Sequence, residues 1–399
     1  MVLNRNTIIL FVAQCMFVAG TVLIVTIGGI VGTELSPSPV LATLPMSLMI
    51  VGTALATIPA SLLMQRFGRR SGFTGAALVG LAACQLGVWS LQNSHFLGFC
   101  STATLIGIAI AFSQQFRFAA AESVATDKVS QAISFILLGS IGGALLGPEL
   151  AARSPAWTPD QPFEGAFHAA SLCYLLAAAA LAACRFQSHA TEHSASAEPA
   201  RPILQIIRLP AVIVAVLAGV VGQGVMTFIM TATPVSMHVV DGHSLDETAA
   251  VIRAHVIAMY LPSLFSGYLI SWLGTRRIIY AGVALFGLTI GLGMLGHEFM
   301  HYWSALVLLG VGWNFLFVGG TTMLVTAYQP SERFRVQAFN DFSVFGFSAL
   351  GSLAGGAVLL QLGWDTVLLS ALVPLVMMLI VLWRLTSTQN PPTPALESR

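Results

Sequence analysis

The sequence predicts an all-α membrane protein whose twelve transmembrane helices form two pseudo-symmetric six-helix bundles. Only 8% of the 399 residues are charged, against about 25% in a soluble domain, and 56% are hydrophobic. The apolar residues gather into twelve runs, each long enough to cross a bilayer of roughly 20 helical residues. The two halves of the chain also repeat one another at a fixed separation, which indicates two copies of one bundle.

The predicted spans follow one another with short polar breaks. Their approximate boundaries are 7–32, 40–64, 71–91, 96–120, 129–152, 166–186, 210–237, 248–272, 278–295, 303–328, 336–360 and 366–385. The first run is too long for the core of a signal peptide and predicts a retained span. An even number of spans places both termini on the same side of the membrane.

Positive charge marks one side of this topology. All 17 Lys and Arg residues except Arg117, Arg153 and Arg253 fall on one side, and a group of acids that includes Asp241 and Glu298 falls opposite. Because short cytoplasmic loops carry the excess of Lys and Arg, that side is expected to be cytoplasmic. We therefore expect a multi-pass protein of the cell inner (plasma) membrane with both termini in the cytoplasm.

Polar segments divide the chain into four parts. The interval 187–208, with Pro199 and Pro202, predicts a cytoplasmic linker between an N-terminal bundle at 1–186 and a C-terminal bundle at 209–385. Residues 386–399 predict a disordered cytoplasmic tail. The linker histidines His189 and His193 are interpreted as exposed residues, and no metal site is predicted.

The repeat is anchored at two distant places. Gly274 follows Gly68 by 206 residues, and Gln337 follows Gln131 by the same 206. Each glycine lies in a short basic hinge that ends a span, in the segments SLLMQRFGRR and GYLISWLGTR. Paired bundles around a central cavity are the architecture that alternating access requires, since one bundle rocks against the other.

The first hinge resembles the loop signature of the major facilitator superfamily, Gly-x-x-x-Asp-Arg-x-Gly-Arg-Arg. The residues that match are Arg66, Gly68, Arg69 and Arg70, with Gly267 and Gly274 in the second copy. The resemblance covers essentially the whole chain and implies a transporter whose hinge residues gate the cytoplasmic side.

Two departures from that signature affect the gate. Ser61 replaces the first glycine and Gln65 replaces the acid, with Ser271 at the acid's place in the repeat. The resemblance implies that the acid helps to latch the gate. With Gln65, the latch must use hydrogen bonds or other acids, such as Glu122 or Asp127.

Small residues line the fifth span in GSIGGALLGPELA. Gly143 and Gly147 share one helical face and allow a second helix to approach closely, while Pro148 bends the end. The segment resembles a glycine–proline signature that the superfamily associates with proton-coupled antiport. Tight packing of small residues is the alternative, and all three residues are assigned to gating.

Arg117 is the most informative charge because an arginine inside a span costs about 2.5–3.5 kcal/mol on insertion scales. It therefore needs a partner or a wet cavity, and Gln114, one turn earlier, is expected to share its face. Arg117 is interpreted as holding an anionic group of a substrate or tuning a proton-carrying acid. The structural alternative is a pair with Glu122, although five residues of separation make that pair geometrically poor.

Three titratable residues are candidates for proton coupling: Asp341, His255 and Glu122. A carboxylate at Asp341 can exchange protons if a dry environment raises its pKa, and histidine titrates near neutral pH. The alternatives are an interfacial pair of Asp341 with Arg333 or Arg335, and a hydrogen-bonded packing role for His255.

A substrate cavity is expected to be mostly apolar with a few placed polar groups. The residues assigned to substrate binding or to the cavity are Gln14, Gln114, Arg117, Gln223, Thr227, Tyr260, Trp313 and Asn314.

These features predict a secondary transporter of a small organic solute, with proton-coupled export (antiport) favoured. Uptake of an organic anion or vitamin-like solute is the alternative, and a membrane sensor without transport is the remaining one. The chain has no phosphate-cradling glycine–lysine motif, so no ATP hydrolysis, enzyme activity or cofactor is predicted. The expected partners are the lipid bilayer, the solute and protons, without nucleic acid, and the protein is expected to be a monomer.

Overall fold

The computed structural model of the chain is helical throughout the part that it describes, which is every residue except 1–2, 39–40, 42–43, 160, 186–200 and 388–399. The expected linker at 187–208 is therefore described only from residue 201 onward, where it forms the short helix α8 (Ile203–Ile206). The expected disordered tail at 386–399 lies almost wholly outside the described residues.

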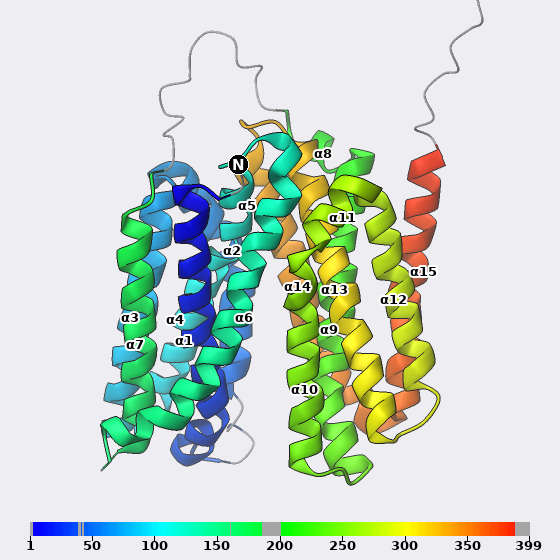
Figure 1. Cartoon of the computed structure of the whole chain (residues 1–399). Helices are drawn as coiled ribbons and strands as arrows, with labels where there is room; N and C mark the ends of the chain where they lie inside the picture. The colour runs from blue at the N-terminus through cyan, green and yellow to red at the C-terminus, as the bar shows by residue number, and fades with distance from the viewer. Residues whose placement is uncertain (1–2, 39–40, 42–43, 160, 186–200, 388–399) are drawn as a thin grey trace, which may run out of the picture.

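The first half of the chain folds into one bundle (Figure 1). Its helices are α1 (Arg5–Leu35), α2 (Leu44–Phe67), α3 (Arg69–Gln92), α4 (Phe96–Ser113), α5 (Phe116–Ala121), η2 (Thr126–Lys128), α6 (Val129–Arg153), η3 (Ser154–Trp157) and α7 (Pro162–Ala182). In this bundle α1 packs on α6, α2 on α4 and α3 on α7.

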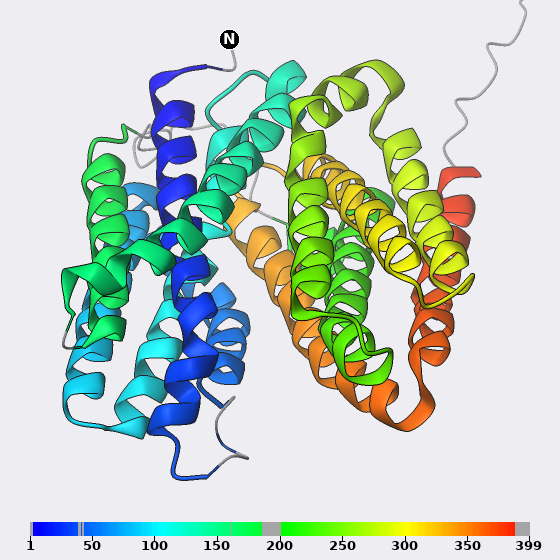
Figure 2. The same cartoon turned by 60° about the horizontal axis from the view of Figure 1, so that its bottom comes forward.

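The second half forms a matching bundle. Its helices are α9 (Pro210–Val235), η4 (Ser236–Val240), α10 (Leu245–Tyr260), η5 (Leu261–Leu264), α11 (Ser266–Leu273), α12 (Thr275–Gly293), α13 (Phe299–Ala327), α14 (Arg333–Leu362) and α15 (Trp364–Ser387). Here α9 packs on α14, α10 on α13 and α12 on α15, so the pairings of the first bundle recur. Figure 2, in which the molecule is tilted so that its bottom in Figure 1 comes forward, shows the two bundles side by side.

The predicted membrane fold is confirmed. Eleven helices among the described residues are long and apolar enough to cross a bilayer, and one further pair, 246–264 and 266–273, makes a twelfth span bent by 50°. Pro262 lies at this bend and lacks the N–H that would continue the helical hydrogen bonds. The fourth span is interrupted as well, because α4 ends at Ser113 and α5 begins only at Phe116.

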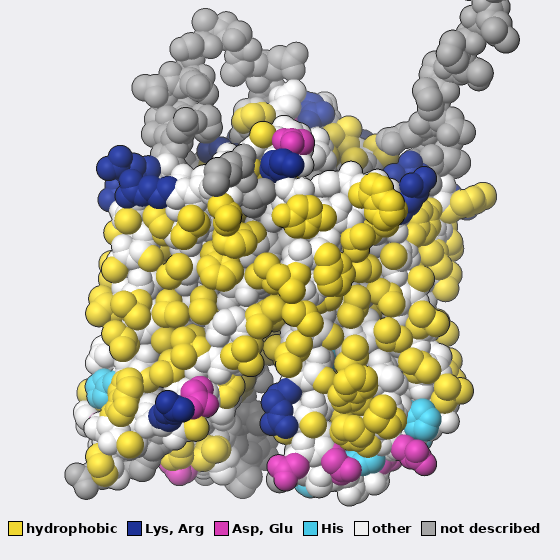
Figure 3. Space-filling view, in the orientation of Figure 1, with side chains coloured by type: hydrophobic (Ala, Val, Ile, Leu, Met, Phe, Trp, Pro, Cys, Tyr) yellow, Lys and Arg dark blue, Asp and Glu magenta, His cyan; other side chains and the backbone are white. Residues whose placement is uncertain are grey.

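The outer surface carries a broad apolar belt, as Figure 3 shows. Lys and Arg side chains gather at the end of the molecule where the N-terminus lies, and Asp, Glu and His side chains gather at the opposite end. We call these the arginine-rich end, which includes Arg66, Arg70, Arg276 and Arg277, and the acidic end. An apolar belt between two polar ends is expected of a protein embedded in lipid.

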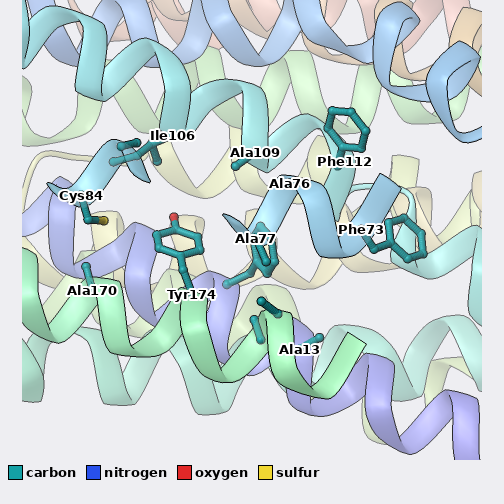
Figure 4. Close-up of a cluster of buried hydrophobic side chains, with 14 of the residues drawn as sticks. Ala13, Phe73, Ala76, Ala77, Cys84, Ile106, Ala109, Phe112, Ala170 and Tyr174 are labelled. Carbon is teal, nitrogen blue, oxygen red and sulfur yellow. The ribbon is translucent and has the colours of Figure 1, made fainter. Parts of the chain in front are cut away.

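Small residues allow the helices of the first bundle to approach closely. The ring of Tyr174, which is fully buried, lies against α3, where a Cβ on Gly80 would sit 2.7 Å from it (Figure 4). Phe17 meets the same ring edge-on at 5.3 Å. Aromatic rings in slots left by glycine and alanine give dense packing without a hydrophobic driving force between helices in lipid. This densely packed bundle forms one wall of the candidate site.

Candidate functional site

The two bundles meet at the arginine-rich end along two seams. We call the first the charged seam, formed by Ser61, Arg69, Glu122, Phe334 and Gln337 between the first bundle and α14. At the acidic end, Figure 3 shows a notch between the bundles. The molecule is therefore closed at the arginine-rich end and hollowed at the acidic end.

Arg69 is the centre of the charged seam. Its Nε and one terminal nitrogen donate to the two carboxylate oxygens of Glu122 at 2.9 and 2.6 Å, and the same terminal nitrogen donates to Gln337 Oε1 at 2.9 Å. Gln337 donates in turn to Glu122 and to the Tyr328 hydroxyl, at 3.1 and 2.6 Å. Planar, bidentate pairing of this kind is the strongest form of charged hydrogen bond. Gln337 belongs to α14, so its hydrogen bonds to Arg69 and Glu122 join the two halves.

Glu122, a candidate for proton coupling, lies in the charged seam. Burial raises the pKa of the Glu122 carboxyl, but the neighbouring guanidinium of Arg69 and its hydrogen bonds outweigh that effect and lower the pKa overall. Arg333, 3.5 Å away, favours the carboxylate as well. The lowered pKa favours the carboxylate at neutral pH, and the contacts of Glu122 are those expected of an acid that substitutes for the missing one at Gln65.

The two hinges have the same backbone. Gly68 and Gly274 have φ angles of 82° and 88°, a left-handed conformation that favours glycine. Gln65, Arg66 and Arg70 are exposed, so of the first hinge only Arg69 turns inward into the seam.

The second seam, which we call the serine seam, contains no charge. The Ser130 hydroxyl donates to the Gly267 carbonyl at 2.9 Å, and the hydroxyls of Ser134 and Ser266 lie 3.2 Å apart. The hydroxyls of Ser130 and Ser271 lie 3.4 Å apart. A Cβ on Gly267 would lie 2.8 Å from the Cα of Gln131, so α6 and α11 touch backbone to backbone.

Inside the seams lies a buried ion pair that joins the bundles. Arg117 on α5 and Asp341 on α14 are 3% and 0% exposed, and a terminal nitrogen of Arg117 lies 2.5 Å from Asp341 Oδ1. Gln115 donates to the other carboxylate oxygen at 2.6 Å, and Asn340 donates to Oδ1 at 3.0 Å. The guanidinium also lies 4.2 Å from the centre of the Phe317 ring. These hydrogen bonds satisfy the Asp341 carboxylate, whereas Nε and the second terminal nitrogen of Arg117 are buried without a hydrogen-bond partner among the described residues.

The structure thus pairs Arg117 with neither Glu122 nor Gln114. Gln114 is the half-buried residue at the end of α4, and the interruption between α4 and α5 breaks the one-turn spacing on which its predicted position depended. Gln115 takes the place beside the ion pair, and the sequence analysis missed it. The alternative pairing of Asp341 with Arg333 is also wrong, since Arg333 lies beside Glu122.

A cavity of about 240 Å³ lies between the bundles farther from the arginine-rich end. Both halves line it, with Thr53 on α2, Gln223 and Thr227 on α9, and Phe345 and Ser348 on α14. Ser348 is seven residues from Asp341, and Asp341 is seven from Phe334. At 1.5 Å per residue each step is about 10 Å along one face of α14, so the ion pair lies midway between cavity and seam.

The cavity's polar groups form one uncharged network. The Trp313 indole N–H donates to Gln223 Oε1 at 2.8 Å, and the hydroxyls of Thr227 and Ser348 lie 2.8 Å apart. Trp313 stacks on Phe317 at 4.7 Å and meets Tyr260 edge-on at 5.6 Å. Of the residues assigned to the cavity, Gln223 and Thr227 line it, and Trp313 and Tyr260 pack behind Gln223.

Gln14 and Asn314 lie in separate contacts. Gln14 donates to the Ser140 hydroxyl on α6 at 2.9 Å, within the first bundle. Asn314 is fully buried and donates to the Met259 carbonyl and the Ser263 hydroxyl at the bend between α10 and α11, at 2.8 and 2.7 Å. The first of these bonds gives a partner to a backbone carbonyl near the bend, and the second fixes a side-chain hydroxyl there.

His255 is placed away from the ion pair. It is 1% exposed on α10, and its Nδ1 lies 2.8 Å from the Leu306 carbonyl of α13. This contact is the hydrogen-bonded packing role that stood as the alternative to proton coupling.

The glycines of the fifth predicted span face α1. A Cβ on Gly143 would lie 2.6 Å from the Cys15 carbonyl, and one on Gly147 would lie 2.9 Å from the Ala19 carbonyl. Pro148 lies within α6, which continues to Arg153. Close packing against α1 explains these residues, so the structure adds no support to the antiport interpretation.

Comparisons with known proteins agree with this architecture. The sequence profile of the Major Facilitator Superfamily matches residues 9–312 and 241–399. The riboflavin transporter RfnT of Brucella anthropi is 37% identical over 381 residues, which cover 95% of this chain and 96% of that protein. The uncharacterized MFS-type transporter YddS of Bacillus subtilis is 29% identical over 377 residues, 90% of this chain and 86% of that protein.

Among solved structures, the transporter FucP in its outward conformation has a TM-score of 0.78 with this chain. The alignment covers 97% of this chain and 100% of FucP at 12% sequence identity, so the likeness concerns the fold alone.

Proposed function

This chain belongs to the Major Facilitator Superfamily, and we propose that it carries an uncharged, planar heteroaromatic solute of the riboflavin type by alternating access. As a membrane transporter it is not an enzyme, and a small molecule is its substrate class. The observation that carries the proposal is the uncharged polar cavity between the bundles, whose lining residue Gln223 accepts a hydrogen bond from the Trp313 indole.

The lining of the cavity favours an uncharged solute. Gln223 offers an amide, Thr53, Thr227 and Ser348 offer hydroxyls, and the rest of the lining is apolar. Such groups match the imide edge and the hydroxyl chain of riboflavin, and an aromatic wall suits its flat ring. A volume of about 240 Å³ takes part of such a molecule, with the remainder in the notch between the bundles.

The buried arginine argues against an organic anion. The sequence assigned Arg117 to an anionic substrate group, but a terminal nitrogen of its guanidinium already pairs with Asp341, and both side chains are sealed from solvent. Nε and the second terminal nitrogen of Arg117 have no hydrogen-bond partner among the described residues, but they are buried. A substrate carboxylate would therefore have to enter the sealed interior beside Asp341, where two like charges would share one guanidinium. Arg117 is better explained as part of the coupling machinery.

We propose that Asp341 couples solute movement to protons. The pair crosses from α5 to α14 and must separate when the bundles rock apart at the arginine-rich end. A proton on Asp341 removes the attraction and lowers the cost of that separation. Because Ser348 lies two turns away on the same helix, solute in the cavity contacts the element that carries the proton.

Transport of riboflavin tests the substrate. We expect purified protein in liposomes to accumulate riboflavin, read from its own fluorescence, and Gln223→Leu to lower the rate about ten-fold because it removes hydrogen bonds from the cavity. Gln85→Leu is the matched control, since Gln85 bonds Ser171 within the first bundle. Equal rates in the two variants, or no riboflavin flux in the wild type, would overturn the assignment.

The direction and the coupling ion are tested by an imposed pH gradient. We propose uptake in place of the export expected from the fifth span, because close packing against α1 is sufficient to account for Gly143 and Gly147. We expect protons to move with the solute, and Asp341→Asn to keep solute exchange while losing pH-driven accumulation. Accumulation that survives in Asp341→Asn would remove Asp341 from coupling, and flux against the proton gradient would restore antiport.

A further inference from the structure

A second hollow lies on the outside of the first bundle near the arginine-rich end. It is a groove of about 390 Å³ whose walls are α2 and α3 and whose floor is α4. Leu63 and Phe67 form the α2 wall, Gly72 and Gly75 belong to the α3 wall, and Phe112 lies on the floor. The groove shares no lining residue with the cavity between the bundles.

The glycines of α3 explain why the groove exists. At Gly72 a Cβ would lie 2.4 Å from Met64 Cγ, so α2 and α3 touch there. At Gly75, one turn farther along, a Cβ would meet nothing within 4 Å. The missing side chain at Gly75 therefore leaves an open slot in an otherwise close-packed surface.

The surroundings of the groove restrict its occupant to an apolar chain. Leu63 and Phe67 are 45% and 59% exposed, and both belong to a membrane-spanning helix. The side chains that face the groove's opening are thus in contact with lipid tails. A slot of this shape and polarity suits an acyl chain, because its burial there replaces contacts with bulk lipid by contacts with fixed side chains.

Positive charge at the end of the groove selects the headgroup. The Arg66 guanidinium lies 5.3 Å from the centre of the Phe67 ring, at the groove's lip, and Arg70 immediately precedes the lining residue Ser71. Gln65 stands where an acid would neutralise this cluster. In the second copy of the hinge, Arg276 stands at the place of Arg70, but Trp272 replaces Arg66 and Ala281 replaces Gly75, so the pair of arginines and the missing side chain do not recur together.

We propose that this groove binds an anionic phospholipid, with an acyl chain beside Gly75 and the phosphate at Arg66 and Arg70. The hinge that holds the headgroup is the hinge that turns Arg69 into the charged seam. Bound lipid therefore restrains the first hinge and favours the closed arginine-rich end.

Filling the groove tests where the chain lies. Purified full-length protein is mixed with equal amounts of phosphatidylglycerol and phosphatidylcholine, and retained lipids are counted by native mass spectrometry. Gly75→Leu is expected to lower retained phosphatidylglycerol several-fold. Gly287→Leu is the matched control, since a Cβ there also meets nothing within 4 Å and Gly287 lies on α12, outside the groove.

Ser71→Leu fills the same groove from its exposed mouth, so the result does not depend on one variant folding. If the folded filling variants retain as much phosphatidylglycerol as Gly287→Leu, the groove is not the site and the proposal is wrong.

Removing the charge tests the headgroup. Arg66→Gln is expected to lower the preference for phosphatidylglycerol over phosphatidylcholine about five-fold, the effect of one basic residue near an anionic headgroup. Arg276→Gln, at an exposed arginine of the second hinge, is expected to leave the preference unchanged. An unchanged preference in Arg66→Gln would overturn the assignment to anionic lipid. Neither outcome depends on the identity of the transported solute.

Discussion

The charged seam and the serine seam close the same end of the molecule by different means. In the charged seam a buried arginine, a glutamate and a glutamine form a network that links α3, α14 and the end of α5. In the serine seam, hydroxyls bond to a carbonyl and to one another while two helix backbones touch. Ser61 and Gly267, 206 residues apart, occupy equivalent positions in the two seams. The duplicated hinge has thus kept its backbone and diverged in the forces that it uses.

The largest expected effect comes from removing the cation of the charged seam. Arg69→Leu leaves Glu122 and Gln337 without their main partner, and Glu122 is only 21% exposed. The bond that Arg69 makes across the bundles is its hydrogen bond to Gln337, and a hydrogen bond to a charged group is worth about 1.5–3 kcal/mol, so its loss is expected to cost the closed state about 2 kcal/mol. The open-to-closed ratio at the arginine-rich end is expected to rise about 30-fold. Spin labels at the exposed Arg70 and Arg277 report it as a longer distance, and an unchanged distance distribution would contradict the assigned role of Arg69.

The serine seam is tested by adding bulk. Gly267→Ala brings a Cβ within 2.8 Å of a backbone atom of α6, which must then move away. Overpacking costs typically about 1–3 kcal/mol, so the closed state is expected to lose about ten-fold in population. Gly287→Ala is the control because its Cβ has open space. If the two alanine variants gave equal closure, backbone contact would not hold this seam.

Low pH is expected to weaken the charged seam selectively, because the serine seam contains no charge. The pKa of Glu122 is lowered from an ordinary value of 4.5 by Arg69 of its own bundle and, across the seam, by Arg333 and Gln337. The part that comes from Arg333 and Gln337 favours closure above about pH 4.5 and is lost as the pH falls through the lowered pKa. Opening at low pH is therefore expected in the wild type and in Gly267→Ala. A pH response of equal size in Glu122→Gln would place the titrating group elsewhere.

The smallest expected effect concerns an ion pair outside both seams. Glu332, just before α14, accepts from Arg201 at 2.6 and 2.7 Å, and these bonds lower the pKa of Glu332 to about 2. Its stabilisation is present above about pH 4.5 and is lost as the pH falls toward 2. Because Arg201 is 34% exposed, Glu332→Gln is expected to cost under about 1 kcal/mol and leave closure unchanged. A thermal melt measures this cost, and a large loss would show that the pair fixes α14.

Hydrophobic length and the 206-residue offset were enough to predict the spans and the two bundles, because both depend on local composition. Arg117 could also be identified from local composition, because a charge within an apolar run is costly to bury. Its partner could not be predicted, since Asp341 lies 224 residues away in the other bundle. Gln115 was missed because a regular helix would have placed Gln114 on that face, and the interruption after Ser113 depends on packing between helices.

The most direct test of the account is to lock the arginine-rich end. The hydroxyls of Ser134 and Ser266 are 3.2 Å apart across the serine seam, so a pair of cysteines there is placed to form a disulfide. We predict that the oxidised Ser134→Cys/Ser266→Cys protein binds riboflavin but does not transport it. Reductant should restore transport, and Ser134→Cys alone should transport throughout. Undiminished transport by the fully cross-linked protein would contradict a solute path that opens between the two bundles.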